Sequence, residues 1–272
     1  MTKAKVLWLL FGLQIVLTLC GIAGLGKGAV FDLAVTYLPL ALLVLHACWV
    51  LTVRRGLAFI LLAAFVGWAA EAISLHYGTL FGGEYRYPTQ AGLFGVPFAI
   101  IAYWAIFIYS GYWLVTTFRY WLGKKKPDYK QSSLALVFLL VLADGLAVTA
   151  IDLFMDPISV RGGSWSWTHG GAYFGVPVGN FVGWFFVAVA ATSVFRLFEY
   201  YWPQPAEPHI GRSALLVPVI GYLLVGLDFF AGALGFGLLP LAAIGTAIVI
   251  VPAAVNVALY VRSKSAAVHK HQ

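Results

Sequence analysis

Residues 57–76 read LAFILLAAFVGWAAEAISLH, a run in which Glu71 is the single formally charged side chain. A helix that crosses the hydrocarbon core of a bilayer needs about 20 mainly apolar residues. Similar runs recur at 6–25, 33–53, 96–121, 132–155, 176–202, 214–235 and 238–261. The sequence therefore predicts an all-α polytopic membrane bundle of about eight transmembrane helices.

The composition agrees with a lipid environment. Of the 272 residues, 62% are hydrophobic and 10% are charged, and the mean hydropathy is +0.90. A soluble domain carries about 25% charged residues. We interpret 1–272 as a single integral membrane domain.

The first run follows Lys3 and Lys5 without a small-residue cleavage pattern, so we expect a retained span rather than a cleaved signal. Cys20 and Cys48 fall inside runs and are interpreted as packing residues.

The net charge of +7 follows the predicted topology. If the N-terminus is cytoplasmic, the outer side carries only Lys27, Arg86 and Arg161 of the 17 Lys and Arg residues. The inner side carries Lys3, Lys5, Arg54, Arg55, Arg119, Lys124, Lys125, Lys126, Lys130, Arg196, Arg212, Arg262, Lys264 and Lys270. This asymmetry follows the positive-inside rule. We therefore expect both termini in the cytoplasm, a prokaryotic plasma membrane and no nucleic-acid partner.

The middle of the chain repeats itself at an offset of 80 residues, in units at about 66–121 and 146–202. Each unit reads as a helix ending in acids, a loop rich in Gly and aromatic residues, and a helix that begins at Gly-Val-Pro. The matched positions are Gly82-Gly83 with Gly162-Gly163, Phe94-Gly95-Val96-Pro97 with Phe174-Gly175-Val176-Pro177, Trp104 with Trp184, and Tyr85 and Tyr87 with Trp165 and Trp167. Two helices return the chain to the same side, so the copies are expected to be related by an axis along the membrane normal. Loops 77–95 and 156–175 should then lie together on the outer side.

Five acids, Glu71, Asp144, Asp152, Asp156 and Asp228, lie inside or at the edge of apolar runs. Ionised carboxylates are costly in hydrocarbon, which makes such residues functional candidates, although a structural hydrogen bond between helices is the alternative. Glu71 and Asp152 recur near the same repeat position. Asp156 precedes Pro157, a position that often ends a helix, so a structural role stays open for it.

Asp152 and Asp156 are four residues apart and therefore share one helix face. Two neighbouring carboxyls in a medium of low dielectric constant cannot both ionise cheaply, so we expect one of them to keep its proton. A protonated, buried carboxyl of this kind is a Brønsted acid with a basic neighbour.

The paired aromatic residues of the two loops are spaced by two, which places each pair on one side of an extended segment. Either they belong to the aromatic belt of a membrane protein, or their π-faces line a pocket and stabilise a cation. Asn180 could hold a water molecule or bond a neighbouring helix. His76 is five residues from Glu71, which does not suit a metal pair, and His169 could be either structural or functional. His46 lies alone in its run and is interpreted as a packed, hydrogen-bonded side chain.

The sequence contains no phosphate loop, dinucleotide fingerprint, His-rich metal motif or serine nucleophile elbow. We therefore expect no metal and no cofactor.

Two blocks of the chain resemble a membrane carotenoid-biosynthesis family. The first comprises Glu71, 81–87, 95–97 and Trp104, and the second comprises 152–157, 163–167, 173–177, Asn180 and 183–184. Together they cover about residues 66–200. The characterised members are carotenoid 1,2-hydratases, including the gamma-carotene and bisanhydrobacterioruberin hydratases. The first block departs slightly, because in the family Phe-Gly stands one residue nearer the tyrosines.

The resemblance implies a hydratase that adds water to the terminal C1,C2 double bond of an acyclic ψ end group. Protonation would give a tertiary carbocation that water captures. The implied partners are water, membrane lipids, an apolar carotenoid that enters from the bilayer, and other enzymes of the carotenoid pathway. We expect Asp152 or Glu71 to donate the proton, with Asp156 sharing it.

The 80-residue repeat predicts that the carboxyls of Glu71 and Asp152 converge in a cavity closed by Tyr85, Tyr87, Trp165 and Trp167, because a pseudo-twofold axis brings equivalent positions together. Two alternatives remain open from the residues. One is an end-group cyclase, which would be an isomerase, and the other is a non-enzymatic transporter that binds carotenoid or lipid.

Overall fold

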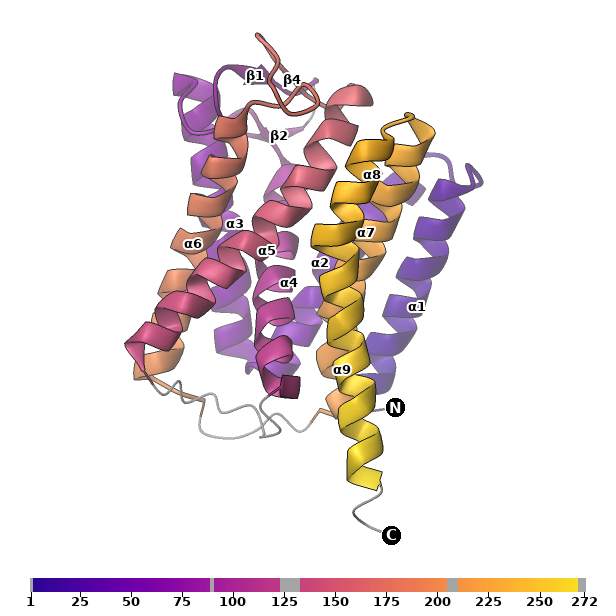
Figure 1. The fold of residues 1–272 in the computed structure, drawn as a ribbon, viewed down its shortest axis with the longest axis vertical. Helices are drawn as coiled ribbons and strands as arrows, with labels where there is room; N and C mark the ends of the chain where they lie inside the picture. The colour runs from indigo at the N-terminus through magenta and orange to yellow at the C-terminus, as the bar shows by residue number, and fades with distance from the viewer. Residues whose placement is uncertain (1, 89–90, 123–132, 205–209, 269–272) are drawn as a thin grey trace.

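The computed structural model describes residues 2–88, 91–122, 133–204 and 210–268 (Figure 1). Within these ranges eight helical segments are long and apolar enough to cross a membrane. They are α1 (Lys3–Ile22), α2 (Ala29–Val50), α3 (Val53–Tyr77), α4 (Phe98–Leu122), α5 (Leu134–Arg161), α6 (Val178–Tyr201), α7 (Val217–Gly235) with the preceding 3-10 turn η1 (Arg212–Leu216), and α8 (Leu239–Gly245) continued by the π-helical η2 (Thr246–Ile250) into α9 (Val251–Val268). The predicted all-α polytopic bundle is confirmed, and the chain is a multi-pass membrane protein.

The helices alternate in direction, so the start of α1 and the end of α9 lie at the same end of the bundle (Figure 1). The short strands lie at the opposite end, which we call the strand end. The assignment of the strand end to the outer side of the membrane stays a prediction. Of the basic residues used for it, Lys124, Lys125, Lys126, Lys130 and Lys270 lie outside the described residues.

One of those basic residues, Arg196, lies in the interior of the bundle. Arg196 was counted as a charge of the inner side, but its side chain is buried within α6 and paired with Asp144. It is therefore part of the interior of the bundle and carries no information about the charge of a loop.

Contacts between the two repeat units follow a local twofold axis. The strand β1 (Tyr85–Arg86) pairs antiparallel with β4 (Ser166–Trp167), so that Arg86 lies opposite Ser166, its own equivalent in the repeat. Further into the bundle the equivalent residues Trp104 and Trp184 stack with ring centroids 3.9 Å apart. Two equivalent residues meet in this way when a twofold axis passes between them, and both loops are thereby brought together at the strand end.

Both units turn into their second helix through the same tight hairpin. Strand β2 (Gly92–Leu93) pairs with β3 (Val96–Pro97), and Tyr173 pairs with Val176 at the equivalent positions. The Phe-Gly dipeptide at each turn has positive φ, 54° and 79° in the first copy and 49° and 91° in the second. Hairpin turns of two residues need positive φ to match the twist of their strands. The repeated Phe-Gly-Val-Pro motif therefore sets where α4 and α6 begin.

Two glycines allow the close packing that seats the aromatic residues. A Cβ atom on Gly67 would lie 2.2 Å from Cγ of Trp104, and one on Gly183 would lie 2.3 Å from the carbonyl oxygen of Leu80. The first contact fixes Trp104 against α3, and the second holds the first loop against α6.

Helix α5 differs from its prediction. The run was expected to stop at residue 155, but α5 continues through Pro157 to Arg161, where the N–H of Gly162 bonds the carbonyl of Ile158 at 2.8 Å. Asp156 is therefore inside the helix, and its side chain is buried. The prediction for His46 is confirmed, because its ring nitrogens lie 2.8 Å from the Tyr109 hydroxyl and 3.0 Å from the Ala214 carbonyl oxygen.

Candidate active site

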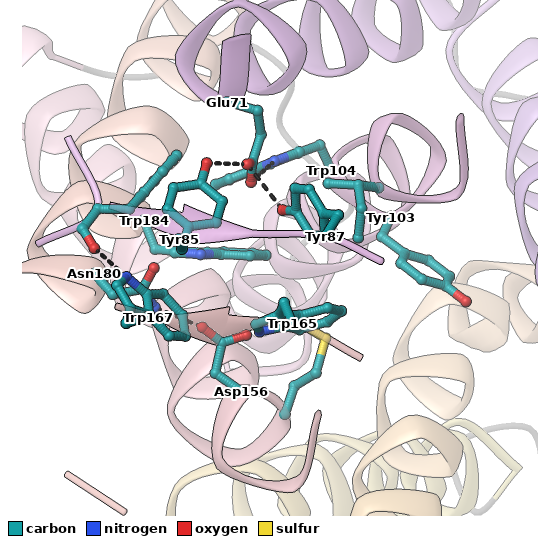
Figure 2. A pocket seen from close by; sticks show the side chains of 13 residues that line it. Glu71, Tyr85, Tyr87, Tyr103, Trp104, Asp156, Trp165, Trp167, Asn180 and Trp184 are labelled. Atoms are coloured by element: carbon teal, nitrogen blue, oxygen red, sulfur yellow. Dashed lines mark hydrogen bonds between the residues drawn. The ribbon is translucent and has the colours of Figure 1, made fainter. Parts of the chain in front are cut away.

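A small cavity lined by aromatic and acidic side chains lies at the strand end, between α3, α4, α5, α6 and the two loops of the repeat (Figure 2). It leaves about 20 Å³ for the centre of a water molecule, which is room for about one water. We call it the acid cavity. Its lining residues are Glu71, Phe81, Tyr85, Tyr87, Ile100, Tyr103, Trp104, Met155, Asp156, Trp165, Trp167, Asn180 and Trp184.

On one side of the acid cavity, the Glu71 carboxylate is surrounded by hydrogen-bond donors. Its Oε2 accepts from the hydroxyls of Tyr85 at 2.5 Å and Tyr87 at 2.9 Å, and its Oε1 accepts from Nε1 of Trp104 at 3.1 Å. Glu71 projects from α3 and is buried. Three donors on two oxygens match an ionised carboxylate, which is an acceptor only.

The phenols that bond Glu71 keep their protons. Burial, and then the negative charge of Glu71, raise the pKa of Tyr85 and Tyr87 above the ordinary value for tyrosine. Both hydroxyls therefore remain donors to the carboxylate through the ordinary pH range.

On the other side of the acid cavity, two aspartates share one amide. Nδ2 of Asn180 donates to Oδ2 of Asp152 and to Oδ2 of Asp156, each at 2.7 Å. All three side chains are buried. No donor in the described part of the chain reaches Oδ1 of Asp152. Two carboxyls with a single amide between them leave oxygens unsatisfied unless a proton sits on one of them, because a protonated carboxyl is itself a donor.

The aromatic residues close the acid cavity by crossing from one unit to the other. Tyr85 packs on Trp167 and Tyr87 on Trp165, with ring centroids 5.6 and 5.9 Å apart. Nε1 of Trp167 donates to the carbonyl of Phe81 at 2.8 Å, which ties the two loops together. Figure 2 shows Glu71 and Asp156 on opposite sides of the cavity, with aromatic rings between them.

Most residues singled out in the sequence meet at this place. Glu71, Asp156, Asn180 and the four loop aromatics line the acid cavity, whereas Asp152 does not line it and lies one hydrogen bond behind it, on Asn180. The structure thus brings these residues together, with Asp156 rather than Asp152 facing the cavity.

The remaining candidates lie elsewhere. Asp144 is deep in the bundle and forms a bidentate ion pair with Arg196, which matches a structural role. Asp228 lines a separate cavity beside α7. His76 and His169 are exposed and do not line the acid cavity.

Several residues of the site were not singled out as site residues. Trp104 and Trp184 form the stacked pair of the cavity wall, and their recurrence at an offset of 80 was the available signal. Tyr103 and Met155 carried no signal, because a tyrosine or a methionine is not unusual in an apolar run. Glu199, buried and bonded by the Tyr112 hydroxyl at 2.8 Å, belongs with Arg196 rather than with the cavity.

Within the described ranges, no group of three or more His, Cys, Asp and Glu side chains is placed to hold a metal ion. The side chains that line the acid cavity offer carboxyls, phenols, indoles and an amide.

A family model described as carotenoid biosynthesis protein matches residues 30–252. The chain belongs to this carotenoid biosynthesis family. The match runs from the start of α2 into α9 and includes every helix and loop that forms the acid cavity. Neither the curated proteins nor the solved structures gave a match. The family membership therefore stands on the family model, and it places the acid cavity in a protein of carotenoid biosynthesis.

Proposed function

We propose that this protein is a carotenoid 1,2-hydratase, a hydro-lyase that adds water across the terminal C1,C2 double bond of an acyclic ψ end group. The observation that carries the proposal is the Asp152–Asn180–Asp156 cluster facing Glu71 across a water-sized, aromatic-walled cavity. Membership of a carotenoid biosynthesis family supplies the substrate class. The residues supply an acid, a base and room for one water.

The proton donor in this proposal is Asp156. An alkene is a very weak base, so the acid that protonates it has to be held protonated and away from bulk water. Asp156 shares one amide nitrogen with Asp152 and faces the cavity, whereas Asp152 is behind it. Asp152 is then the partner that keeps the proton on the pair, and Asn180 fixes the positions of both carboxyls.

The aromatic wall stabilises the carbocation. Transfer of the proton to C2 leaves a tertiary cation at C1, and a desolvated cation–π contact is worth about 2 kcal/mol or more. Trp165, Trp167, Tyr85 and Tyr87 line the acid cavity. They also exclude bulk water, so that the cation meets the bound water molecule.

Glu71 acts as the base in the second half of the reaction. Water attacks C1 and forms the C–O bond, and the proton it loses passes to the Glu71 carboxylate. Return of that proton to the aspartate pair through cavity water restores the starting state, so that the net change is alkene plus water to tertiary alcohol. The three donors on Glu71 favour its ionised form and hold it oriented until that step.

The experiment is to incubate membranes containing the protein with lycopene, an acyclic carotenoid with two ψ end groups, and to determine the molecular masses of the products. We expect a gain of one water per reacted end group. A product of unchanged mass and altered absorption would make the protein a cyclase, and absence of any product would favour a carotenoid- or lipid-binding transporter. Membranes with Asp156→Asn protein at equal abundance are the control.

We further propose that the protein lies in a prokaryotic plasma membrane with both termini in the cytoplasm, so that the acid cavity is near the outer face. The distribution of Lys and Arg supports this orientation. Reporter fusions at Gly163, in a loop at the strand end, and at the N-terminus should fall on opposite sides. Two fusions on the same side would refute the topology.

A further inference from the structure

A second and larger cavity lies beside the acid cavity and has no part in the chemistry proposed above. It is lined by α1, α2, α4, α5, α7 and the loop that carries Trp165, and it leaves about 360 Å³ by the same measure. Most of its lining side chains are apolar, among them Phe11, Leu42, Ile106, Val225 and Phe229. We call this space the chamber.

The chamber and the acid cavity share a wall. Tyr103, Met155 and Trp165 line both. In Figure 2 the ring of Tyr103 extends away from the side chains grouped around Glu71. Methionine is unbranched and has three rotatable bonds, so Met155 can change conformation at low cost. This wall is therefore a place where the end of a chain in the chamber can reach Asp156.

The chamber is long in the direction of the helices. Its lining on α7 runs from Val217 to Phe229, which is about 18 Å at the helical rise of about 1.5 Å per residue. The acid cavity, by contrast, has room for about one water. A long hydrocarbon substrate must therefore lie outside the acid cavity, and the adjoining elongated apolar space has the shape for it.

We propose that the chamber binds the isoprenoid chain of the carotenoid and that the terminal alkene reaches Asp156 between Tyr103, Met155 and Trp165. This inference rests on the proposed function and adds to it the binding site of the substrate. It also gives a role to α1, α2 and α7, which lie outside the two repeat units. The acid cavity alone would serve any terminal alkene, whereas the chamber selects one that continues as a long apolar chain.

Filling the chamber tests the proposal by activity. A Cβ atom at Gly221 meets only Phe11, at 3.7 Å, so a side chain there extends into the chamber. Gly221→Phe should lower hydration of lycopene at least tenfold. Hydration of myrcene, a short alkene with the same terminal group, should keep its wild-type rate. The matched control is Gly12→Phe, because Gly12 has no atom within 4 Å of its Cβ position and does not line the chamber.

The comparison of the two substrates separates the two proposals. Wild-type hydration of lycopene by folded Gly221→Phe protein would overturn the chamber as substrate site and leave the hydratase standing. Failure of the wild-type protein to hydrate either alkene would overturn the hydratase, and the chamber would then be judged by binding alone.

A binding test uses a smaller change that avoids misfolding. Gly221→Cys in a Cys20→Ala, Cys48→Ala background is treated with an apolar maleimide in phosphatidylcholine vesicles, with Gly12→Cys as control. Lycopene should slow labelling of the first cysteine several-fold and leave the second unchanged. Equal labelling with and without lycopene would overturn the proposal. So would protection that is already complete in lipid alone, because the occupant would then be an acyl chain.

Discussion

The two repeat units share one backbone arrangement but differ in the hydrogen bonds that their acids form. In unit 66–121 the aromatic side chains are donors, and Tyr85, Tyr87 and Trp104 all donate to one carboxylate, Glu71. In unit 146–202 the acids are two, and they share the single amide of Asn180. A twofold frame thus builds an asymmetric site, with a carboxylate that accepts three hydrogen bonds on one side of a cavity and two aspartates that share one amide on the other.

The comparison explains why the equivalent loop positions differ in residue type. Phenols in the first unit reach their own Glu71, whereas the indole of Trp165 faces Asp156 and that of Trp167 bonds the backbone of the other loop. A phenol placed at Trp165 would offer the aspartate pair a stronger donor and favour its ionisation. The aromatic residues thus line the cavity and also influence the ionisation of the carboxyls beside them.

The largest effect is expected from the acid of the second unit. Asp156→Asn keeps the shape and the hydrogen-bonding capacity but removes the transferable proton. Hydration of lycopene should fall by about 10²- to 10⁴-fold or more, with the amount of folded protein unchanged. Product formation at equal protein is the measurement, and Asp32→Asn, an exposed acid at the start of α2, is the control. Near wild-type turnover of Asp156→Asn would remove Asp156 as the donor.

A smaller but still large loss is expected at the base of the first unit. Glu71→Gln removes the carboxylate that accepts the proton. It also places an amide NH₂, itself a donor, among the three donors that bond Glu71, and so disturbs those hydrogen bonds. We expect the rate to fall by about 10²-fold or more. Carotenoid retention by the purified protein should remain, since the chamber is not altered. A variant that hydrates at the wild-type rate would show that water is deprotonated elsewhere.

Removing one donor from Glu71 should cost less than removing Glu71 itself. A hydrogen bond to a charged group contributes about 1.5–3 kcal/mol, so Tyr85→Phe should lower the rate by about ten- to a hundredfold. The raised pKa of Tyr85 keeps its phenol protonated, and the deficit should therefore be the same from neutral to moderately alkaline pH. A deficit that disappears as the pH rises would contradict the assignment of the phenol as a neutral donor.

The smallest effect is expected from one wall residue. Trp165→Leu removes one cation–π contact of about 2 kcal/mol but leaves the three other aromatic faces in place. We expect about a thirtyfold loss, while Trp165→Phe should recover much of it. A loss as large as that of Asp156→Asn would mean that Trp165 acts mainly by placing the aspartate.

Sequence reasoning was most successful where the signal was periodic or duplicated. Apolar runs of membrane length predicted the helices, and recurrence at an offset of 80 pointed to the loops that meet at the acid cavity. Sequence reasoning failed where three-dimensional packing alone determines the position of a residue. The fifth run was expected to end before Pro157, although α5 continues past it, and Arg196 was counted among the charges of the inner side, although it pairs with Asp144 inside the bundle.

The parts of the site that escaped prediction are those without a chemical signature. Tyr103 and Met155 form the wall shared with the chamber because of where α4 and α5 cross, which no spacing within either helix reveals. Likewise, the choice of Asp156 over Asp152 as the acid that faces the cavity depends on the rotation of α5 against Asn180 of α6. Both residues share a helix face, so the sequence alone could not order them.

The proposed mechanism requires that the aspartate pair holds a proton at neutral pH while Glu71 is ionised. Infrared spectroscopy of the purified protein tests it directly through the C=O stretching band of a protonated carboxyl. Difference spectra between wild type and each variant remove the contribution of other buried acids. We expect the band assigned to this site to be lost in Asp156→Asn and retained in Glu71→Gln. A band that is lost in Glu71→Gln and retained in Asp156→Asn would place the proton on the first unit and contradict the account.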